Sequence, residues 1–158
     1  MGSPGLASGG TAIAVLSSLT FPAHLAPIPQ PQWSLGVQTR EADHAQRCVI
    51  AHYLADLEPD LEAEVLWDEL ALADYAHVSD GDLAPVGIAA VRGMAPSLHL
   101  NLGDGYLRQG RLAEARAQLV AGRAHQDALG ADGYGALIRN GLTALSARIE
   151  AADEAIVN

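Results

Sequence analysis

Residues 96–128 read PSLHLNLGDGYLRQGRLAEARAQLVAGRAHQDA and predict two helices joined by a very short turn. The first helix carries large apolar side chains four residues apart, namely Leu98, Leu102 and Tyr106. It is expected to end at Gly110, because glycine readily adopts the left-handed conformation that closes a helix. The second helix carries small or apolar residues on one face, namely Leu112, Ala115, Leu119 and Gly122. Because the connection is so short, the two helices are expected to pack antiparallel.

Five positions of this hairpin follow a recurring pattern. A Leu-Gly pair is followed by an aromatic residue, an alanine and a large apolar residue, here Leu102, Gly103, Tyr106, Ala115 and Leu119. In this pattern the segment resembles a tetratricopeptide (TPR) repeat. It departs from the family at His99, where tryptophan is usual, and at Asp127, where a proline usually closes the repeat. The resemblance implies stacked antiparallel hairpins of helices.

An earlier segment predicts a second, degenerate hairpin. Its helices are expected at residues 40–57 and from Asp60 to about residue 77, separated by Pro59. Their expected apolar faces are Ile50, Leu54 and Leu57 in the first helix and Leu66, Trp67, Leu70 and Ala73 in the second. A shift of 52 residues pairs Ile50, Ala51, Leu54, Ala63 and Trp67 with the five pattern positions of the later hairpin. Because a repeat of this family has about 34 residues, residues 78–95 are interpreted as an inserted loop, with a helical turn near 86–91.

The two ends of the chain are expected to differ. Residues 1–39 carry no charged side chain and hold five of the eight prolines, which predicts a flexible leader before a helical domain at 40–152. The last helix is expected at 132–151 and resembles the helix that closes a repeat array. Its apolar stripe is Tyr134, Leu137, Ile138, Gly141, Leu142, Leu145 and Ile149. Residues 153–158 are expected to fray. The predicted fold is all-α, with about five helices in TPR-like hairpins and a C-terminal capping helix.

Charge is distributed unevenly along the 158 residues. The formal net charge is −10, and all of this excess lies in residues 40–82. Nucleic acids and anionic membranes require a basic surface, so neither is expected as a partner. The acidic segment is compatible with a cationic partner, but the preferred interpretation is a solvated surface that aids solubility. All nine basic residues are arginine, which is typical of GC-rich coding sequences and favours a bacterial source.

Localisation signals are weak. Cys48 is the only cysteine, so no intrachain disulfide can form, and a reducing compartment, the cytoplasm, is expected. The apolar run at 12–21 is too short to span a bilayer, and no basic segment precedes it as in a secretory signal.

No catalytic motif is recognisable, and neither enzymatic activity nor a cofactor is predicted. One constellation is compatible with metal binding: His44, Cys48 and His52 follow each other four residues apart on one helical stripe. The outer two lie about 12 Å apart along a helix, so one ion cannot bind all three. A metal-binding sensor or an enzyme that uses this face is the alternative hypothesis. The other interpretation is a half-buried cysteine with histidines on a groove face.

The leading hypothesis is a non-enzymatic protein-protein interaction module, a scaffold or adaptor. The resemblance implies a concave surface formed mainly by the first helix of each hairpin. On this alignment the binding residues are Cys48, His52, Asp56, Leu100, Asn101, Asp104 and Arg108. Because Asp56 and Asp104 would repel an anion, the expected partner is a neutral or basic protein segment, not an acidic tail. So few hairpins leave an open end, and a homo-oligomer is compatible with this.

Overall fold

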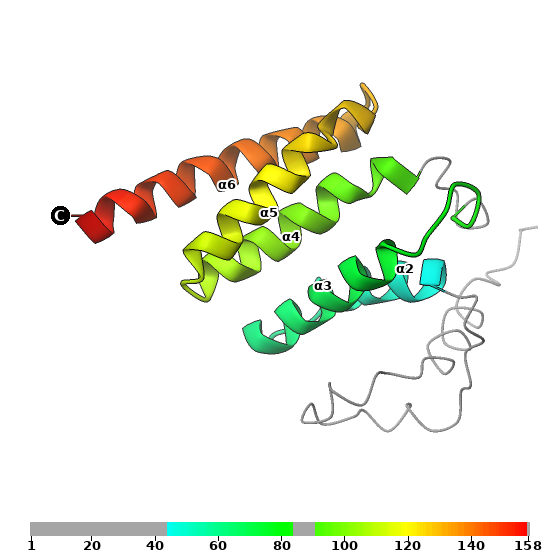
Figure 1. Ribbon diagram of the computed structural model, residues 1–158, viewed down its shortest axis with the longest axis horizontal. Helices are drawn as coiled ribbons and strands as arrows, with labels where there is room; N and C mark the ends of the chain where they lie inside the picture. The colour runs from blue at the N-terminus through cyan, green and yellow to red at the C-terminus, as the bar shows by residue number, and fades with distance from the viewer. Residues whose placement is uncertain (1–43, 84–90, 158) are drawn as a thin grey trace, which may run out of the picture. The chain divides into compact units, whose positions relative to one another are not determined.

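The computed structural model describes residues 44–83 and 91–157, and in these residues it is all-α, as predicted (Figure 1). The α-helices are α2 (His44–Ala55), α3 (Leu61–Tyr75), α4 (Ala95–Arg108), α5 (Leu112–Ala124) and α6 (Gly133–Val157). Two short 3-10 helices are η4 (Val91–Gly93) and η5 (Gln126–Ala128). None of the described helices has both the length and the apolar composition that a membrane span requires.

The helices pack mainly with their neighbours in the chain. α2 packs against α3 and α4 against α5, so there are two helical hairpins. α3 also contacts α4, which joins the hairpins, and α6 packs against both α4 and α5 (Figure 1). α6 therefore covers the second hairpin, which is the place that the sequence predicted for a closing helix.

The turn between α4 and α5 has the predicted geometry. Gly110 has a φ of 76°, in the left-handed region. The backbone N–H of Gly110 donates to the Leu107 carbonyl at 3.0 Å, and that of Arg111 donates to the Tyr106 carbonyl at 2.8 Å. This pair of bonds is a Schellman motif, which satisfies the last carbonyls of the helix. The glycine at 110 thus sets both the end of α4 and the antiparallel return.

The second hairpin and α6 share a core of large apolar side chains. Its buried members are Val65, Leu102, Tyr106, Ala115, Leu119, Leu129, Ile138, Leu142, Leu145 and Ile149. Gly103 lies inside this core, and a Cβ placed on it would lie 2.9 Å from Leu145 Cδ2 and 3.2 Å from Gln118 Cβ. The absence of a side chain at Gly103 therefore lets α4 come close to both α5 and α6.

The first hairpin has a different core. The buried members from α2 and α3 are small, namely Ala45, Cys48, Ala51 and Ala71, and the larger ones come from the following segment and α4, namely Leu83, Val91, Met94 and Leu98. The predicted stripe of α2 is wrong, because Ile50 and Leu54 are only half-buried and Leu57 is 78% exposed. The alanines and Cys48 face α3 instead, since small side chains let the two helix backbones come close.

The prediction of the buried face of α3 is also wrong, because a different side of the helix is buried. Leu66, Trp67 and Leu70 are half-buried and Ala73 is exposed, whereas Val65, Asp68, Ala71 and Asp74 are buried. Apolar residues occur all around this helix, so their spacing alone does not identify one face. Two of the four residues on the buried face are aspartates, Asp68 and Asp74, and a hydrophobic pattern assigns aspartates to the surface.

The proposed shift of 52 residues can be compared with the burial of each pair. Ala51 and Gly103 form the only one of the five pairs in which both residues are buried. In the other four pairs the second-hairpin residue is buried, but its partner Ile50, Leu54, Ala63 or Trp67 is half-buried. The two hairpins therefore share helix lengths and order, while their buried faces differ.

The connection between the hairpins contributes to the core. Leu83, Val91 and Met94 are buried against the first hairpin, and the Val91 backbone N–H donates to Asp80 Oδ1 at 3.2 Å. The helical turn predicted near 86–91 lies almost entirely outside the described residues, as does the predicted leader at 1–39. α6 extends to Val157, through residues where fraying was predicted.

Candidate functional site

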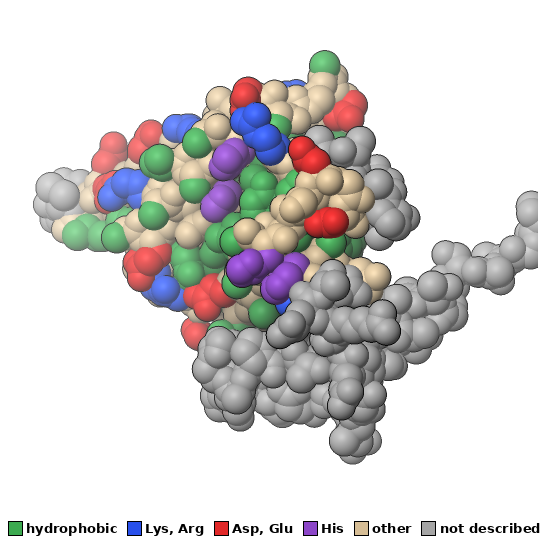
Figure 2. Space-filling model, turned by 45° about the vertical axis from the view of Figure 1, so that its right-hand side comes forward, with side chains coloured by type: hydrophobic (Ala, Val, Ile, Leu, Met, Phe, Trp, Pro, Cys, Tyr) green, Lys and Arg blue, Asp and Glu red, His purple; other side chains and the backbone are tan. Residues whose placement is uncertain are grey.

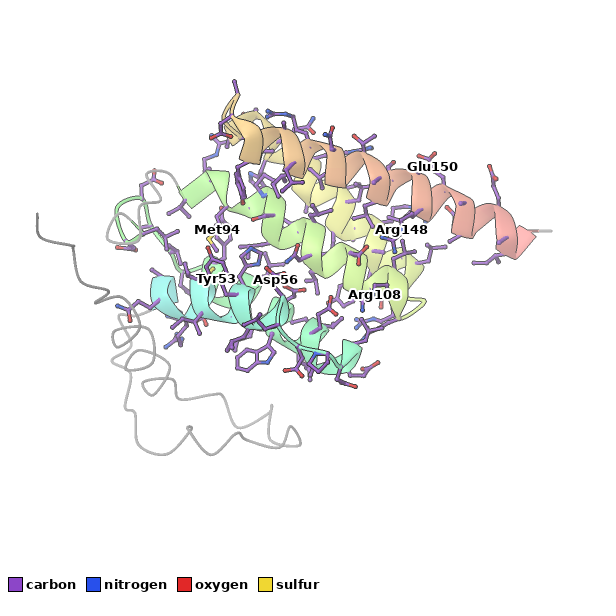
Figure 3. All side chains as sticks on the ribbon, turned by 180° about the vertical axis from the view of Figure 1, so that it is seen from behind. Tyr53, Asp56, Met94, Arg108, Arg148 and Glu150 are labelled. Atoms are coloured by element: carbon purple, nitrogen blue, oxygen red, sulfur yellow. The ribbon has the colours of Figure 1, made fainter. Side chains whose placement is uncertain are left out.

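A cleft of about 660 Å³ opens between α2, α4 and α6. In Figure 3, which shows the side opposite to that of Figure 1, α4 passes between α2 and α6, with Tyr53, Asp56 and Met94 near this cleft. The described lining residues are Val49, His52, Tyr53, Asp56, Gly93, Met94, Ser97, Asn101, Ala128, Leu129, Gly130, Asp132, Tyr134, Leu137 and Ile138. Clefts of this size fall within the range of roughly 300–1,000 Å³ that is usual for ligand sites.

Large apolar side chains reach solvent along this cleft. Tyr53 on α2 is 65% exposed, and Tyr134 and Leu137 on α6 are 50% and 66% exposed. These three are half of the six large hydrophobic residues that are exposed in the described part of the chain. Apolar side chains gathered on one exposed surface are typical of a binding site, whereas scattered ones need no explanation.

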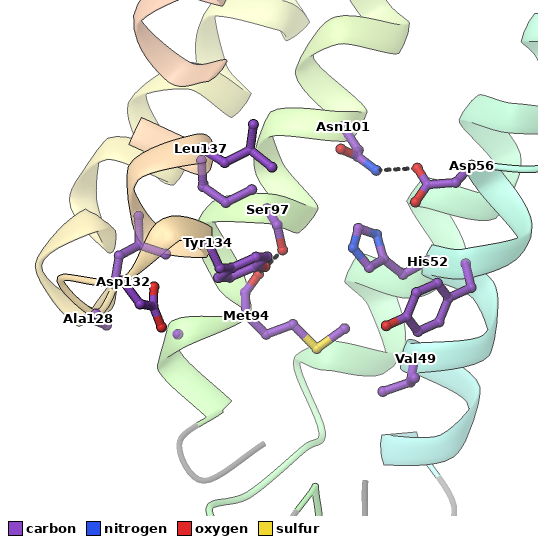
Figure 4. Close-up of a pocket in the computed structure, with 15 residues that line it drawn as sticks. Val49, His52, Asp56, Met94, Ser97, Asn101, Ala128, Asp132, Tyr134 and Leu137 are labelled. Atoms are coloured by element: carbon purple, nitrogen blue, oxygen red, sulfur yellow. Dashed lines mark hydrogen bonds between the residues drawn. The ribbon is translucent and has the colours of Figure 1, made fainter. Parts of the chain in front are cut away.

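Two carboxylates stand on opposite sides of the cleft (Figure 4). Asp56, just after α2, accepts a hydrogen bond at 3.0 Å from Asn101 Nδ2 of α4. Asp132, just before α6, accepts one at 2.8 Å from the Gly135 backbone N–H and so caps the helix. Neither forms an ion pair with a described residue, and no arginine is among the described residues that line the cleft.

His52 lies between these carboxylates, on the α2 side (Figure 4). Burial lowers the pKa of its imidazole, and the nearby Asp56 opposes this only in part. The ring is therefore neutral at pH 7 and adds no positive charge to the cleft. Its Nδ1 atom is buried without a hydrogen-bond partner in the described structure. The two carboxylates consequently determine the charge of this cleft.

A smaller cleft of about 360 Å³ adjoins the first and shares Asp56 and Asn101 with it. Here the acidic residues have basic partners. Asp104 pairs with Arg148 of α6, and Glu64 pairs with Arg108, whose Nη1 lies 2.6 Å from Glu64 Oε1. Figure 3 shows Arg108 and Arg148 beside each other on this side of the molecule. The smaller cleft is therefore an ion-paired contact between helices and offers less unpaired charge.

The structure brings together part of the predicted binding face. His52, Asp56 and Asn101 line the main cleft, and Asp56, Leu100, Asn101 and Asp104 line the smaller one. Arg108 lies 3.8 Å from Asp104 on the same helix, although Glu64 is its closer partner. Leu100 packs against Gly141 of α6, where a Cβ would lie 2.5 Å from Leu100 Cδ2.

Cys48 does not belong to this face, because it is 0% exposed and lies between α2 and α3. Burial and, to a smaller extent, Asp74 raise the pKa of its thiol to about 12. The thiol therefore stays protonated at neutral pH, whereas a metal ligand has to be a thiolate. The prediction that Cys48 lines the binding surface is wrong.

The three residues of the metal hypothesis have separate environments. His44 Nδ1 lies 2.7 Å from Asp74 Oδ1, and its ring stacks on His77 with centroids 4.4 Å apart. His52 faces the main cleft and Cys48 the interior. Within residues 44–83 and 91–157, no group of three His, Cys, Asp or Glu side chains is arranged to hold a metal ion.

Asp68 of α3 is the most unusual titratable group near the clefts. It is buried, and neither of its carboxyl oxygens has a hydrogen-bond partner in the described structure. Burial raises its pKa to about 8, and the negative charges of Glu64, Asp56 and Asp104 act in the same direction. Asp68 therefore binds a proton at neutral pH and adds little negative charge to the site.

Several residues of the main cleft were missed by the sequence interpretation. Tyr134 and Leu137 were assigned to the buried stripe of the last helix, but the buried stripe is Ile138, Leu142, Leu145 and Ile149. Leu137 stands one residue before the buried Ile138, so it lies on the adjoining face of the helix, as does Tyr134. The sequence signal for this was that the apolar stripe is wider than the face that one neighbouring hairpin can cover. Met94 and residues 128–132 belong to connections, and no periodic pattern predicts their position.

One face of the molecule carries side chains of several kinds. Figure 2 shows acidic and basic side chains spread over the face in view, with hydrophobic side chains nearer its centre. We found no match for this chain among known protein families, curated protein sequences or solved structures.

Proposed function

We propose that this protein is a TPR-like interaction module that binds a segment of a partner protein in the main cleft. The observation that carries the proposal is the exposure of Tyr53, Tyr134 and Leu137 along one cleft between α2, α4 and α6. α2 and α4 are the first helices of their hairpins, and in TPR-like stacks these helices line the concave surface. A scaffold or adaptor role follows from such a surface.

The chemistry of the cleft supports binding rather than catalysis. Its side walls are apolar or aromatic, and its polar side-chain groups are two carboxylates, one neutral imidazole, one amide, the phenol hydroxyls of Tyr53 and Tyr134, and the hydroxyl of Ser97. That hydroxyl donates to the Met94 carbonyl at 2.9 Å, so its proton is engaged within the fold. Apolar contact would supply most of the affinity, and the polar groups would orient the partner. We propose action in the cytoplasm, with which the buried thiol of Cys48 is compatible.

A peptide selection tests the proposal. Random dodecapeptides displayed on phage are selected on the full-length protein, and the recovered peptides are synthesised and titrated. We expect micromolar binders that lose at least fivefold in affinity for Leu137→Ser, because this change removes an exposed apolar side chain from the cleft wall.

Val120→Ser is the matched control. Val120 is 65% exposed, almost as much as Leu137, but it lies on α5 and does not line the cleft. Binding should be unaffected by this change. If the selected peptides bind Leu137→Ser as well as the parent, or lose affinity equally for Val120→Ser, the main cleft is not the binding site.

A further inference from the structure

We infer that the main cleft recognises a segment of a partner protein in which an apolar stretch has a basic residue on each side. This inference rests on the proposed function and adds the chemistry of the partner. The supporting arrangement is an apolar floor and walls between Asp56 and Asp132, which stand on opposite sides of the cleft (Figure 4).

Each carboxylate has capacity for another hydrogen bond. Asp56 accepts one bond from Asn101, and Asp132 accepts one side-chain bond from the Gly135 backbone N–H. A carboxylate offers about four acceptor positions, so both can accept further bonds from a guanidinium or an ammonium group. The existing bonds hold the two side chains in place, which lowers the entropic cost of binding a cation.

The surroundings do not neutralise this charge. Asp104 and Glu64, in the neighbouring smaller cleft, are paired with Arg148 and Arg108. Asp56 and Asp132 have no such partner in the described structure, and the lowered pKa of His52 keeps the imidazole neutral. A cationic partner would thus be attracted by two carboxylates, and an acidic partner would be repelled by the same two groups.

Aromatic rings strengthen the preference for a cation. Tyr53 precedes Asp56 by three residues in the sequence, and Tyr134 follows Asp132 by two residues. Both rings line the cleft and are largely exposed. A guanidinium group bound to either carboxylate would have an aromatic side chain near it, which favours arginine through contact with the ring face.

Three sets of synthetic peptides test the inference. Each peptide has one to four leucines between two flanking residues, and the flanking residues are both Arg, both Gln or both Glu. Affinity for the full-length protein is measured by fluorescence anisotropy at 20 and 300 mM salt. At low salt we expect the Arg set to bind best and the Glu set worst, with a difference that shrinks as salt screens the charges.

Variants identify the groups responsible. Asp56→Asn and Asp132→Asn should each weaken the Arg peptides about two- to fivefold and leave the Gln peptides unchanged, as expected for exposed ion pairs. Asparagine also caps helices well, so α6 should keep its start in Asp132→Asn. Asp153→Asn is the charge-matched control, because Asp153 pairs with Arg116 and does not line the cleft.

The outcomes separate this inference from the proposed function. Equal binding of the Arg and Gln sets would overturn the inference, as would an effect at only one of the two cleft carboxylates or an equal effect of Asp153→Asn. In each of these cases loss of binding in Leu137→Ser would still support the proposed function. Displacement of the Arg peptides by micromolar spermidine would overturn the need for an apolar stretch. If no peptide of any set binds, the proposed function fails together with the inference.

Discussion

The two hairpins of this protein have similar lengths and different interiors. The second is packed with leucines and isoleucines around Gly103, and α6 closes it. The first is packed with alanines and Cys48, and it also buries two aspartates, Asp68 and Asp74. One of these, Asp74, is satisfied by Arg47 and His44, while Asp68 has no hydrogen-bond partner in the described structure.

This difference shows that a helical hairpin with few large apolar residues between its helices can pack beside one that is rich in leucine. The second hairpin is stabilised mainly by the burial of large apolar side chains. This stabilisation falls when a side chain is shortened and a cavity remains. The first has less apolar volume between its helices and depends more on specific polar contacts. We therefore expect the two hairpins to respond to different kinds of substitution.

The largest expected effect is in the first hairpin. Arg47→Met should lower the free energy of unfolding by about 3–5 kcal/mol, because it leaves the buried carboxylate of Asp74 without its cationic partner. Chemical denaturation measures the loss, and hydrogen exchange should accelerate first in α2 and α3. The double change Arg47→Met, Asp74→Leu should recover part of the stability, since it removes the unpaired charge as well. An unchanged denaturation midpoint in Arg47→Met would mean that this ion pair does not stabilise the hairpin.

Leu119→Ala tests the second hairpin. Leu119 is buried, as predicted, so its truncation should cost about 2–5 kcal/mol through lost apolar contact and the cavity that remains. The control is Leu57→Ala in the first hairpin, where the side chain is mostly exposed and the expected change is within about 0.5 kcal/mol. Comparable losses in the two variants would contradict the assignment of the two interiors.

Gly103→Ala sharpens the comparison at the one pair of positions that is buried in both hairpins. The added Cβ would lie 2.9 Å from Leu145 Cδ2, so we expect a loss of about 1–3 kcal/mol even though alanine favours helix. The first hairpin already has a Cβ at the corresponding Ala51. If thermal unfolding shows Gly103→Ala to be as stable as the parent, α6 does not pack tightly on α4 there.

Asp68→Leu should have the smallest effect when it is measured near pH 4, and it should be stabilising. Removing an unpartnered buried carboxyl should raise the free energy of unfolding by about 1–2 kcal/mol at pH 4, and this gain should grow as pH rises. The pKa of Asp68 is raised from 3.8 to about 8 in the folded state, so this carboxyl binds a proton there that the unfolded chain has released. Stability should therefore fall as pH rises from about 4 to about 8 and then level off.

Thermal midpoints between pH 5 and 9 check this prediction. The parent should lose stability across this range relative to Asp68→Leu, whose profile should be flatter. A parent and a variant with parallel profiles would show that Asp68 is ionised at neutral pH in the folded protein.

The sequence predicted the second hairpin well and the first poorly, and the reason is physical. Leu98, Leu102, Tyr106 and Leu119 are large and stand at helical spacing, so their burial follows from the pattern. Apart from Val65, the buried residues of α2 and α3 are alanines, Cys48 and aspartates, and small or charged residues carry no hydrophobic signal of their own. Their burial is set by the approach of neighbouring helices, which local spacing does not encode.

The candidate site was predicted in part for the same reason. His52, Asp56 and Asn101 were found because they follow from the hairpin order. Tyr134, Leu137 and Asp132 come from α6 and the turn before it, and their meeting with α2 depends on how the last helix packs. A sequence pattern places each residue on a face of its own helix, and the cleft exists only where three such faces meet.

The central claim is that the cleft between α2, α4 and α6 is where a partner binds. Amide shift mapping by NMR tests it most directly, with the isotope-labelled full-length protein and the tightest peptide from the phage selection. We predict that the largest shift changes occur at the backbone amides of His52, Asn101 and Leu137, with little change at Val120 on α5. Changes concentrated on the outer face of α5, or spread evenly over the described helices, would contradict the claim.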